Sequence, residues 1–304
     1  MKELIIPSSS DSISLSTIVT EPSSEPKAVL QIVHGMAEHK ERYIPLMNYL
    51  SDRGYVCVIN DLRGHGKSVS TPDDLGYMGK VGWKGLVHDE HDVTEWIQKE
   101  YKDIPLFLFG HSMGSLIVRS YCKTFDNDIH GLIVCGSPSA NPLVGTGKFI
   151  ASCIKLFKGN RFRSPLLTKL TTGAYGKKFR KEAPNAWICS DPAVVDAYNR
   201  DPLCGFPFTV NGYTALFNLL EDVYSNKGWL VRNHSLPVLF IAGSEDPCID
   251  GINNFSKAVS FFRSVGYSSV TSKVYPKMRH EIHNEIGKET VWEDIADTLD
   301  RWVG

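Results

Sequence analysis

The sequence predicts an α/β protein, a doubly wound and mostly parallel sheet with a helical insertion. Short β-rich runs are almost continuously hydrophobic, which is typical of parallel strands covered by helices on both faces. These runs alternate with amphipathic stretches of helical period, and the alternation predicts helices that connect the strands. The alternation lapses between about residues 141 and 232, where the chain is rich in Pro, Gly and aromatic residues, and this lapse predicts the insertion.

The expected strands and helices divide the chain into three parts. We expect strands at residues 28–33, 55–59, 106–109, 131–135, 238–242 and 272–275. We expect helices at residues 43–53, 85–100 and 113–125, and a last helix with Val291, Ile295, Leu299 and Trp302 on one face. Residues 1–140 are then the first part of the core, 141–232 a mostly helical cap, and 233–304 the second part of the core. Such a cap would lie over the strand ends, shape a pocket and exclude water.

Residues 110–114, Gly-His-Ser-Met-Gly, follow an expected strand and precede an expected helix. In that setting Gly-x-Ser-x-Gly is typical of a nucleophile elbow, where a sharp turn lifts the serine oxygen above the sheet. The glycines allow the tight turn, and the helix N-terminus offers N–H groups and a positive dipole to an anion. Ser112 is therefore the candidate nucleophile, and the alternative is an ordinary turn.

A serine hydroxyl is a weak nucleophile, so it needs a histidine base, and the histidine needs a carboxylate to orient it. After an elbow of this kind the expected order is serine, acid, histidine, each following a strand. Asp246 follows the strand at 238–242, and Glu245 and Asp250 compete with it for the role. His280 is the first histidine after the strand that ends at residue 275, and we prefer it to His283.

Two backbone N–H groups must also stabilise the oxyanion of a tetrahedral intermediate. One is expected from Met113, directly after the serine. The other is expected from Met36, in the His34-Gly35-Met36 loop after the strand at 28–33, where Gly35 allows close approach of the backbone. Losing one such donor costs about 10²–10³ in rate, so this loop should matter nearly as much as the three side chains.

Five motifs together resemble the monoacylglycerol lipase and lysophospholipase-like family of α/β-hydrolases. They are residues 34–39 with 42–43, 61–68, 110–114, 243–246 and 279–285. The match runs through the chain in order, except for the insertion. It implies the α/β-hydrolase fold, and it implies the following site residues: Ser112 as nucleophile, Asp246 as acid, His280 as base, and Met36 and Met113 as oxyanion donors. The resemblance also selects Asp246 over its two acidic neighbours.

Other polar residues of these motifs are expected to support the loops. The family's elbow often ends in two glycines, whereas Ser115 follows Gly114 here, a change that leaves the chemistry intact. His65 could act as a second base, but we favour a role in buttressing the first loops. Glu38 and His39 are likewise expected to hold the oxyanion loop rather than to react.

Composition excludes several classes of function. The chain has 304 residues, 42% of them hydrophobic and 22% charged, and its net charge of −1 gives no argument for binding nucleic acid. The seven cysteines include no Cys-x-x-Cys pair, so we expect buried reduced thiols, no metal and no cofactor. The apolar stretch Leu4-Ile5-Ile6 is too short for a signal peptide, and no segment approaches the roughly 18 apolar residues of a membrane span. We therefore expect a cytoplasmic protein without a transmembrane segment.

His88 and His91 lie among Asp89, Glu90 and Asp92 in an expected helix. A metal cluster is one interpretation of this run. We expect instead the solvated face of that helix.

The insertion carries an unusual charge. Residues 141–181 hold ten basic side chains and no Asp or Glu, so this stretch carries +10 against −11 for the rest of the chain. A basic, partly amphipathic cap suits an anionic lipid surface, or a substrate with a phosphate or carboxylate. The alternative is a solubilising face distributed around helices.

The sequence thus predicts a serine hydrolase of carboxylic esters, acting on monoacylglycerols, lysophospholipids or similar monoacyl esters through an acyl-enzyme on Ser112. One alternative is an aminopeptidase of the proline-iminopeptidase type. It would need acidic groups near the cap to bind a substrate ammonium, and the candidates are Glu182, Glu221 and Asp222. A further alternative is a non-catalytic ligand-binding protein on the same fold.

Overall fold

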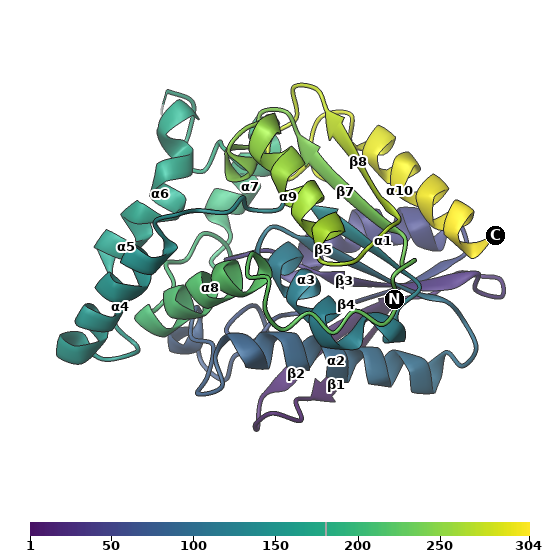
Figure 1. Ribbon diagram of the computed structural model, residues 1–304, viewed down its shortest axis with the longest axis horizontal. Helices are drawn as coiled ribbons and strands as arrows, with labels where there is room; N and C mark the ends of the chain where they lie inside the picture. Colours follow the sequence, from purple (N-terminus) through teal and green to yellow (C-terminus); the bar gives the residue numbers. More distant parts are fainter. Residues whose placement is uncertain (180) are drawn as a thin grey trace.

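The computed structural model describes residues 1–179 and 181–304, and its centre is a sheet of eight strands (Figure 1). The strand order is β1-β2-β4-β3-β5-β6-β7-β8. β1 pairs antiparallel with β2, and β2 with β4, while the five later pairs are parallel. The strands span β1 Lys2–Pro7, β2 Ser14–Thr20, β3 Ala28–Val33, β4 Tyr55–Asn60, β5 Leu106–His111, β6 Gly131–Cys135, β7 Val238–Gly243 and β8 Val270–Tyr275. This mostly parallel sheet confirms the predicted fold class.

The six predicted strands are present, and two more extend one edge of the sheet. β3 and β6 have the predicted bounds, β4, β5 and β7 end slightly later, and β8 begins earlier, at Val270. The sequence prediction lacks β1 and β2. β1 is mostly exposed and half of it is polar or Pro, so it has no long apolar run. An edge strand of this kind pairs through its backbone and needs little hydrophobic patterning.

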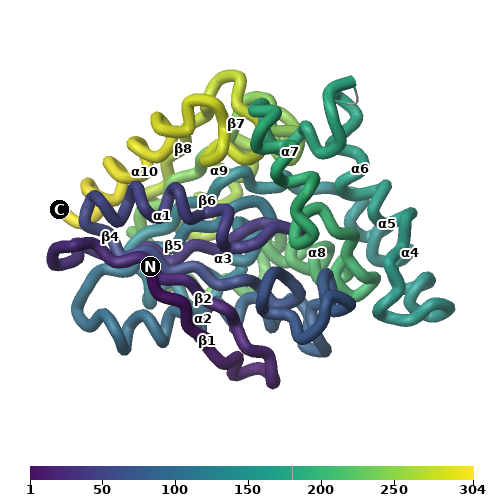
Figure 2. Tube along the Cα trace, turned by 180° about the vertical axis from the view of Figure 1, so that it is seen from behind, coloured from purple at the N-terminus to yellow at the C-terminus, as the bar shows by residue number. Residues whose placement is uncertain are grey.

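Helices cover the sheet on both faces (Figures 1 and 2). α1 and α10 lie on one face, where Leu46 and Leu299 belong to one buried cluster. α2, α3 and α9 lie on the other face, where Leu116 and Phe262 belong to a second cluster. These helices span α1 Ile44–Ser51, α2 Trp83–Glu100, α3 Met113–Phe125, α9 Ile252–Ser264 and α10 Lys288–Val303. The sequence prediction contains all of them except α9.

One prediction for α2 is wrong. Asp89 and Glu90 do not lie on a solvated face, because both are fully buried. Asp89 forms a 2.7 Å salt bridge with Arg63, and Glu90 accepts a hydrogen bond from the side chain of Gln31 on β3. The helix therefore turns these two acids toward the sheet, where each finds a polar partner that the local sequence does not reveal.

Residues 141–232, between β6 and β7, are here called the cap segment, and the described part of this segment contains five α-helices. They span α4 Val144–Lys158, α5 Pro165–Leu170, α6 Thr172–Tyr175, α7 Pro192–Arg200 and α8 Val210–Val223. No strand lies in the described part of this segment. α8 packs against α3 of the core and α4 packs against α8, so α4 and α5 stand away from the sheet (Figure 1). Among the described helices, none has both the length and the apolar content that a bilayer crossing requires.

Candidate active site

The turn at Ser112 joins β5 to α3. Ser112 has φ 53° and ψ −117°, a backbone conformation that is uncommon outside glycine and that clusters at functional sites. Both flanking glycines are required by close packing. A Cβ on Gly110 would lie 2.5 Å from Val118 Cγ2, and one on Gly114 would lie 2.1 Å from the carbonyl oxygen of Val33. The elbow thus fixes Ser112 at the carboxyl end of β5.

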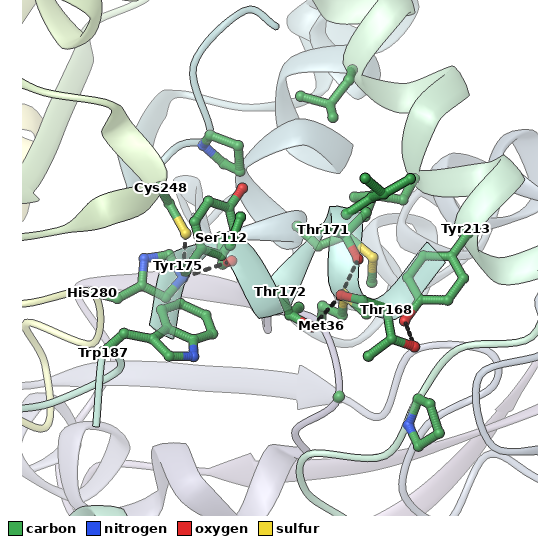
Figure 3. Close-up of a pocket in the computed structure, with 18 of the residues that line it drawn as sticks. Met36, Ser112, Thr168, Thr171, Thr172, Tyr175, Trp187, Tyr213, Cys248 and His280 are labelled. Atoms are coloured by element: carbon green, nitrogen blue, oxygen red, sulfur yellow. Dashed lines mark hydrogen bonds between the residues drawn. The ribbon is translucent and has the colours of Figure 1, made fainter. Parts of the chain in front are cut away.

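The structure brings Ser112, His280 and Asp246 into one hydrogen-bonded row, and Figure 3 shows the serine and histidine of this row. Nε2 of His280 lies 2.8 Å from Oγ of Ser112. Nδ1 of the same ring lies 3.0 Å from each carboxylate oxygen of Asp246. Asp246 follows β7 and His280 follows β8, which are neighbouring parallel strands. Such a row can take a proton from the serine and stabilise the imidazolium that forms.

The competing residues lie elsewhere. Asp250 is exposed and Glu245 is half-buried, and neither is hydrogen-bonded to His280 in the described part of the chain. His283 is buried and stacks on Tyr43, with ring centroids 4.7 Å apart. Both ring nitrogens of His283 lack a hydrogen-bond partner among the described residues. The geometry therefore favours Asp246 and His280 over these alternatives.

Two opposing effects set the ionisation of His280. Burial lowers the pKa of the ring, but the charge of Asp246 and its hydrogen bond outweigh burial and raise the pKa of His280 well above the ordinary histidine value. The ring is therefore well suited to hold a proton taken from Ser112. Cys248 Sγ lies 3.8 Å from Nε2, and burial raises the pKa of this thiol to about 11, so Cys248 stays a neutral neighbour.

Two buried histidines shape the loop that carries Met36. Burial lowers the pKa of His34 to about 4 and that of His65 to about 3, so both rings are neutral. Nδ1 of His34 donates to the carbonyl oxygen of Gly35 (2.8 Å), which orients the Gly35–Met36 peptide. Nε2 of His65 accepts from the N–H of Ala37 (3.1 Å). His65 thus has the buttressing position expected from the sequence.

Both predicted oxyanion donors are available at the pocket. Among the described residues the N–H of Met36 has no hydrogen-bond partner. Met113 is the first residue of α3, so its N–H has no partner within the helix. Both residues line the same pocket as Ser112. Their N–H groups can therefore serve an anion that forms at the serine.

A guanidinium links the oxyanion loop to residues 279–285, here called the histidine loop. Arg42 donates to both carboxylate oxygens of Glu281, at 2.7 and 2.5 Å, and to Glu38 at 2.7 Å. Glu38 also accepts from the N–H of Gly35 (2.6 Å). Although burial raises it, the pKa of Glu38 is held well below the ordinary value by its hydrogen bond to His111 and the charge of Arg42. Sequence reasoning missed this link because Arg42 and Glu281 are 239 positions apart.

Ser112 and His280 line an apolar pocket of about 290 Å³ beneath the cap segment (Figure 3). α4 and α8 supply much of its apolar wall, including Val144, Ile150, Leu216, Phe217 and Leu220. Trp187, also from the cap segment, packs against His280 with ring centroids 5.1 Å apart. An enclosed apolar wall that ends at a nucleophile can hold an acyl chain. No sequence motif marks these cap residues, because their place depends on how the helices pack.

Three groups of described residues place possible metal ligands close together. They are Asp246 with Cys248 and His280, His111 with Cys135 and His283, and His39 with Asp201 and Cys204. The first group contains two members of the hydrogen-bonded row. We assign no cofactor to the site, because a serine, a histidine and a carboxylate supply the nucleophile and both proton transfers of ester hydrolysis.

Comparison with known proteins identifies the family. A model of the family described as serine aminopeptidase, S33, matches residues 24–287. The chain belongs to this family. The chain is 27% identical to the monoglyceride lipase of Mus musculus over 287 residues, which are 93% of this chain and 84% of the mouse protein. It is 25% identical to phospholipase YtpA of Bacillus subtilis (strain 168) over 288 residues, 93% of this chain and 99% of YtpA.

A solved structure of an ester hydrolase is also similar to this chain. The structure of a highly thermostable carboxyl esterase from Bacillus coagulans, in complex with glycerol, matches with a TM-score of 0.92 at 27% identity, covering 100% of this chain and 99% of the esterase. The predicted resemblance to monoacylglycerol lipase-like α/β-hydrolases is confirmed. The predicted enzyme class, a hydrolase of carboxylic esters, is confirmed as well.

Proposed function

We propose that this chain hydrolyses monoacyl esters, such as monoacylglycerols or lysophospholipids, through an acyl-enzyme on Ser112. The observation that carries the proposal is the 2.8 Å contact between Ser112 Oγ and His280 Nε2 at an apolar pocket. The names of the relatives, a monoglyceride lipase and a phospholipase, support the substrate class. The cap segment, residues 141–232, serves as the cap over this pocket.

The reaction proceeds in two halves. Ser112 Oγ attacks the ester carbonyl while Nε2 of His280 takes its proton, and Asp246 stabilises the imidazolium. The N–H groups of Met36 and Met113 donate to the oxyanion that develops. His280 then protonates the leaving alcohol, which leaves the acyl group on Ser112. Water repeats the cycle on the acyl-enzyme, with His280 again as base, and frees the fatty acid.

Labelling and turnover test this assignment together. A fluorophosphonate should label the parent protein and fail to label Ser112→Ala, and Ser112→Ala or His280→Ala should lower kcat by roughly 10⁴–10⁶. Ser264→Ala, which removes an exposed hydroxyl at the end of α9, is the matched control and should behave like the parent. Labelling that survives Ser112→Ala contradicts the assignment. A parent that is not labelled supports the non-catalytic alternative.

A substrate panel tests the acyl pocket. Long-chain monoacylglycerols and lysophospholipids should give a higher kcat/KM than acetyl and aromatic esters, because only a long chain fills the apolar wall formed by α4 and α8. Preference for acetyl esters would contradict the proposed substrate class.

The family description names an aminopeptidase, so that alternative needs its own test. The three acids that could bind a substrate ammonium already pair with cations of the protein: Glu182 with Arg279, Glu221 with Lys148, and Asp222 with Lys123. We therefore expect nitrophenyl esters to be turned over and aminoacyl anilides to be poor substrates. A higher kcat/KM for the anilides than for the esters would favour the aminopeptidase function over the esterase function.

We further propose that the cap segment contacts an anionic lipid surface. On α4 the side chains of Phe149, Leu156 and Phe157 are 70%, 80% and 81% exposed, and Lys155 and Lys158 are exposed on the same helix. An exposed apolar patch with a basic rim is typical of a membrane contact. The ten basic residues of 141–181 add charge of the required sign, and of these Arg180 lies outside the described residues.

Vesicle sedimentation tests this contact. The parent should bind vesicles of phosphatidylserine and phosphatidylcholine at low salt and release at high salt, since exposed charges are screened. The double variant Leu156→Ser/Phe157→Ser should bind more weakly, whereas Ile5→Ser, an exposed apolar change on β1, should bind like the parent. Binding that is absent at low salt, or indifferent to salt, would overturn the proposal.

We also propose that the protein is located in the cytoplasm. All seven cysteines are free and only Cys153 is exposed, as expected where thiols stay reduced. Cell fractionation should place the protein with cytosolic markers, and recovery in a secreted fraction would contradict this.

A further inference from the structure

Two groups of the cap segment hold the backbone next to the predicted oxyanion donor. The carbonyl oxygen of Ala37, the residue after Met36, accepts from the N–H of Gly205 (2.9 Å) and from the hydroxyl of Tyr198 (3.0 Å). Tyr198 lies on α7 and is 7% exposed. Both lone-pair positions of this carbonyl are thus occupied by donors that come from the cap segment and not from the core.

Ala37 needs such support because its backbone is strained. Its φ is 52°, in the left-handed region that a residue with a Cβ rarely adopts. Strain of this kind costs about 1–3 kcal/mol and persists only where the surroundings over-determine it. The core holds one side of Ala37, through its N–H and Nε2 of His65 (3.1 Å). The cap segment holds the other side.

A second contact joins the loop that follows β3 to the cap segment. His39 is 7% exposed, and its ring nitrogens face Glu41 (2.7 Å) and Asp201 (2.9 Å), the residue at the C-terminal end of α7. Although burial lowers it, the pKa of His39 is raised to about 10 by hydrogen bonds to Cys204 and to the two carboxylates, so the ring is a cation at neutral pH. Arg42, three residues after His39, places its guanidinium 4.9 Å from the ring centre of Tyr198.

We propose that Tyr198 and Asp201 are positioning residues for the oxyanion hole, so that the cap segment completes the catalytic geometry as well as covering the pocket. This inference rests on the proposed serine-hydrolase function. With the ties in place, Ala37 keeps its left-handed conformation and the N–H of Met36 stays directed into the pocket. When α7 withdraws, Ala37 relaxes and the donor turns away, so a displaced cap stops turnover even with substrate bound.

The experiment compares two conservative variants with two matched controls. Tyr198→Phe removes only the hydroxyl that reaches Ala37, and Asp201→Asn removes only the charge that faces His39. Tyr101→Phe removes a hydroxyl that donates a hydrogen bond to Glu21, and neither of these two residues lines the pocket. Asp196→Asn removes an exposed carboxylate from the same helix, where it pairs with Arg200.

Four quantities are measured on the full chain for each variant: kcat and KM with a nitrophenyl ester, Ki for a long-chain trifluoromethyl ketone, and Kd for a non-hydrolysable ether analogue of a monoacylglycerol. The ketone forms an oxyanion on the serine and the ether does not. Each positioning variant should lose about 10-fold in kcat and the double variant about 10²-fold, approaching the loss of one oxyanion donor. The Ki for the ketone should rise in parallel, while the Kd for the ether and both controls stay within about twofold.

The possible outcomes distinguish a failure of the proposed function from a failure of the positioning inference. A parent that no fluorophosphonate labels contradicts the proposed function itself. A labelled, active parent whose double variant keeps its kcat, or changes only KM and the ether Kd, overturns the positioning inference and leaves the proposed function standing. If Tyr198→Phe unfolds, as judged by circular dichroism, Asp201→Asn carries the test, and Asp201→Glu should restore most of the lost kcat.

Discussion

Asp246 faces Nδ1 of His280 with both carboxylate oxygens, each 3.0 Å away. The opposite nitrogen of the same ring lies 2.8 Å from Ser112 Oγ. The carboxylate therefore acts on the serine only through the imidazole, by orienting the ring and by raising the pKa of His280 against the effect of burial. The pH dependence of the reaction should report this relationship directly.

In the parent, kcat/KM should rise with pH as His280 loses its proton, with a midpoint above the ordinary pKa of 6.5. In Asp246→Asn the raising charge is gone and burial remains, so the midpoint should move to lower pH. The plateau should also fall by about 10⁴, as found when a triad carboxylate is replaced by an amide. Profiles of a nitrophenyl ester between pH 5 and 10 measure both effects. Asp250→Asn, an exposed neighbour, is the control, and an unshifted midpoint in Asp246→Asn would contradict the assignment of the acid.

Replacing Glu281 by Gln should destabilise the fold. Glu281 is 3% exposed and shares Arg42 with Glu38, so the substitution leaves a buried guanidinium with one carboxylate fewer. Removing one partner of a buried ion pair costs on the order of 3 kcal/mol. Urea unfolding measures the loss. Glu289→Gln, an exposed change near the start of α10, should stay within about 0.5 kcal/mol of the parent, and equal stability of the two variants would show that the buried pair contributes little.

Much of the core and of the hydrogen-bonded row could be predicted from the sequence, because the signals are local. Runs such as 131–135 are apolar throughout, and Ser112 lies between recognisable strand and helix patterns. α9 carried a signal that the prediction overlooked, since Phe255, Val259 and Phe262 have helical spacing and are buried. The ties between Ala37 and Tyr198, and between Arg42 and Glu281, had no such signal. They join positions far apart in the chain, and the sequence around either partner does not show which residue it contacts in the fold.

The buried acid Glu90 should make stability depend on pH. Burial raises its pKa to about 8, from 4.5 in an unfolded chain. The folded state therefore keeps a proton that the unfolded state releases, so the stabilisation is complete below pH 4.5 and is lost as the pH rises to about 8. Glu90→Gln cannot ionise and should escape this loss. In Glu90→Gln the pH-dependent loss of stability should therefore be smaller by on the order of 5 kcal/mol, at 1.36 kcal/mol for each pKa unit.

Urea unfolding at several pH values between 4.5 and 9 measures this difference. The amide can be accommodated because Oδ1 of Asn60, beside Glu90, has no hydrogen-bond partner among the described residues. Glu95→Gln, an exposed change on the same helix, should decline with pH like the parent. A decline in Glu90→Gln as steep as in the parent would mean that Glu90 is ionised in the folded protein.

The strained backbone at Ser112 predicts that two substitutions with the same effect on activity differ in stability. Ser112→Ala and Ser112→Gly both remove the hydroxyl, so both should abolish turnover. Only glycine adopts φ 53°, ψ −117° freely. Relief of the backbone strain should stabilise the glycine variant by about 1–3 kcal/mol. The greater conformational entropy of glycine in the unfolded chain offsets about 0.5–1 kcal/mol of this gain, so Ser112→Gly should be about 1 kcal/mol more stable than Ser112→Ala.

Ser120, in the interior of α3, is the matched control. There Gly should be less stable than Ala by about 0.5–1 kcal/mol. The same sign at both serines would mean that the elbow stores no strain, whereas opposite signs would show that the catalytic geometry is held at the expense of stability.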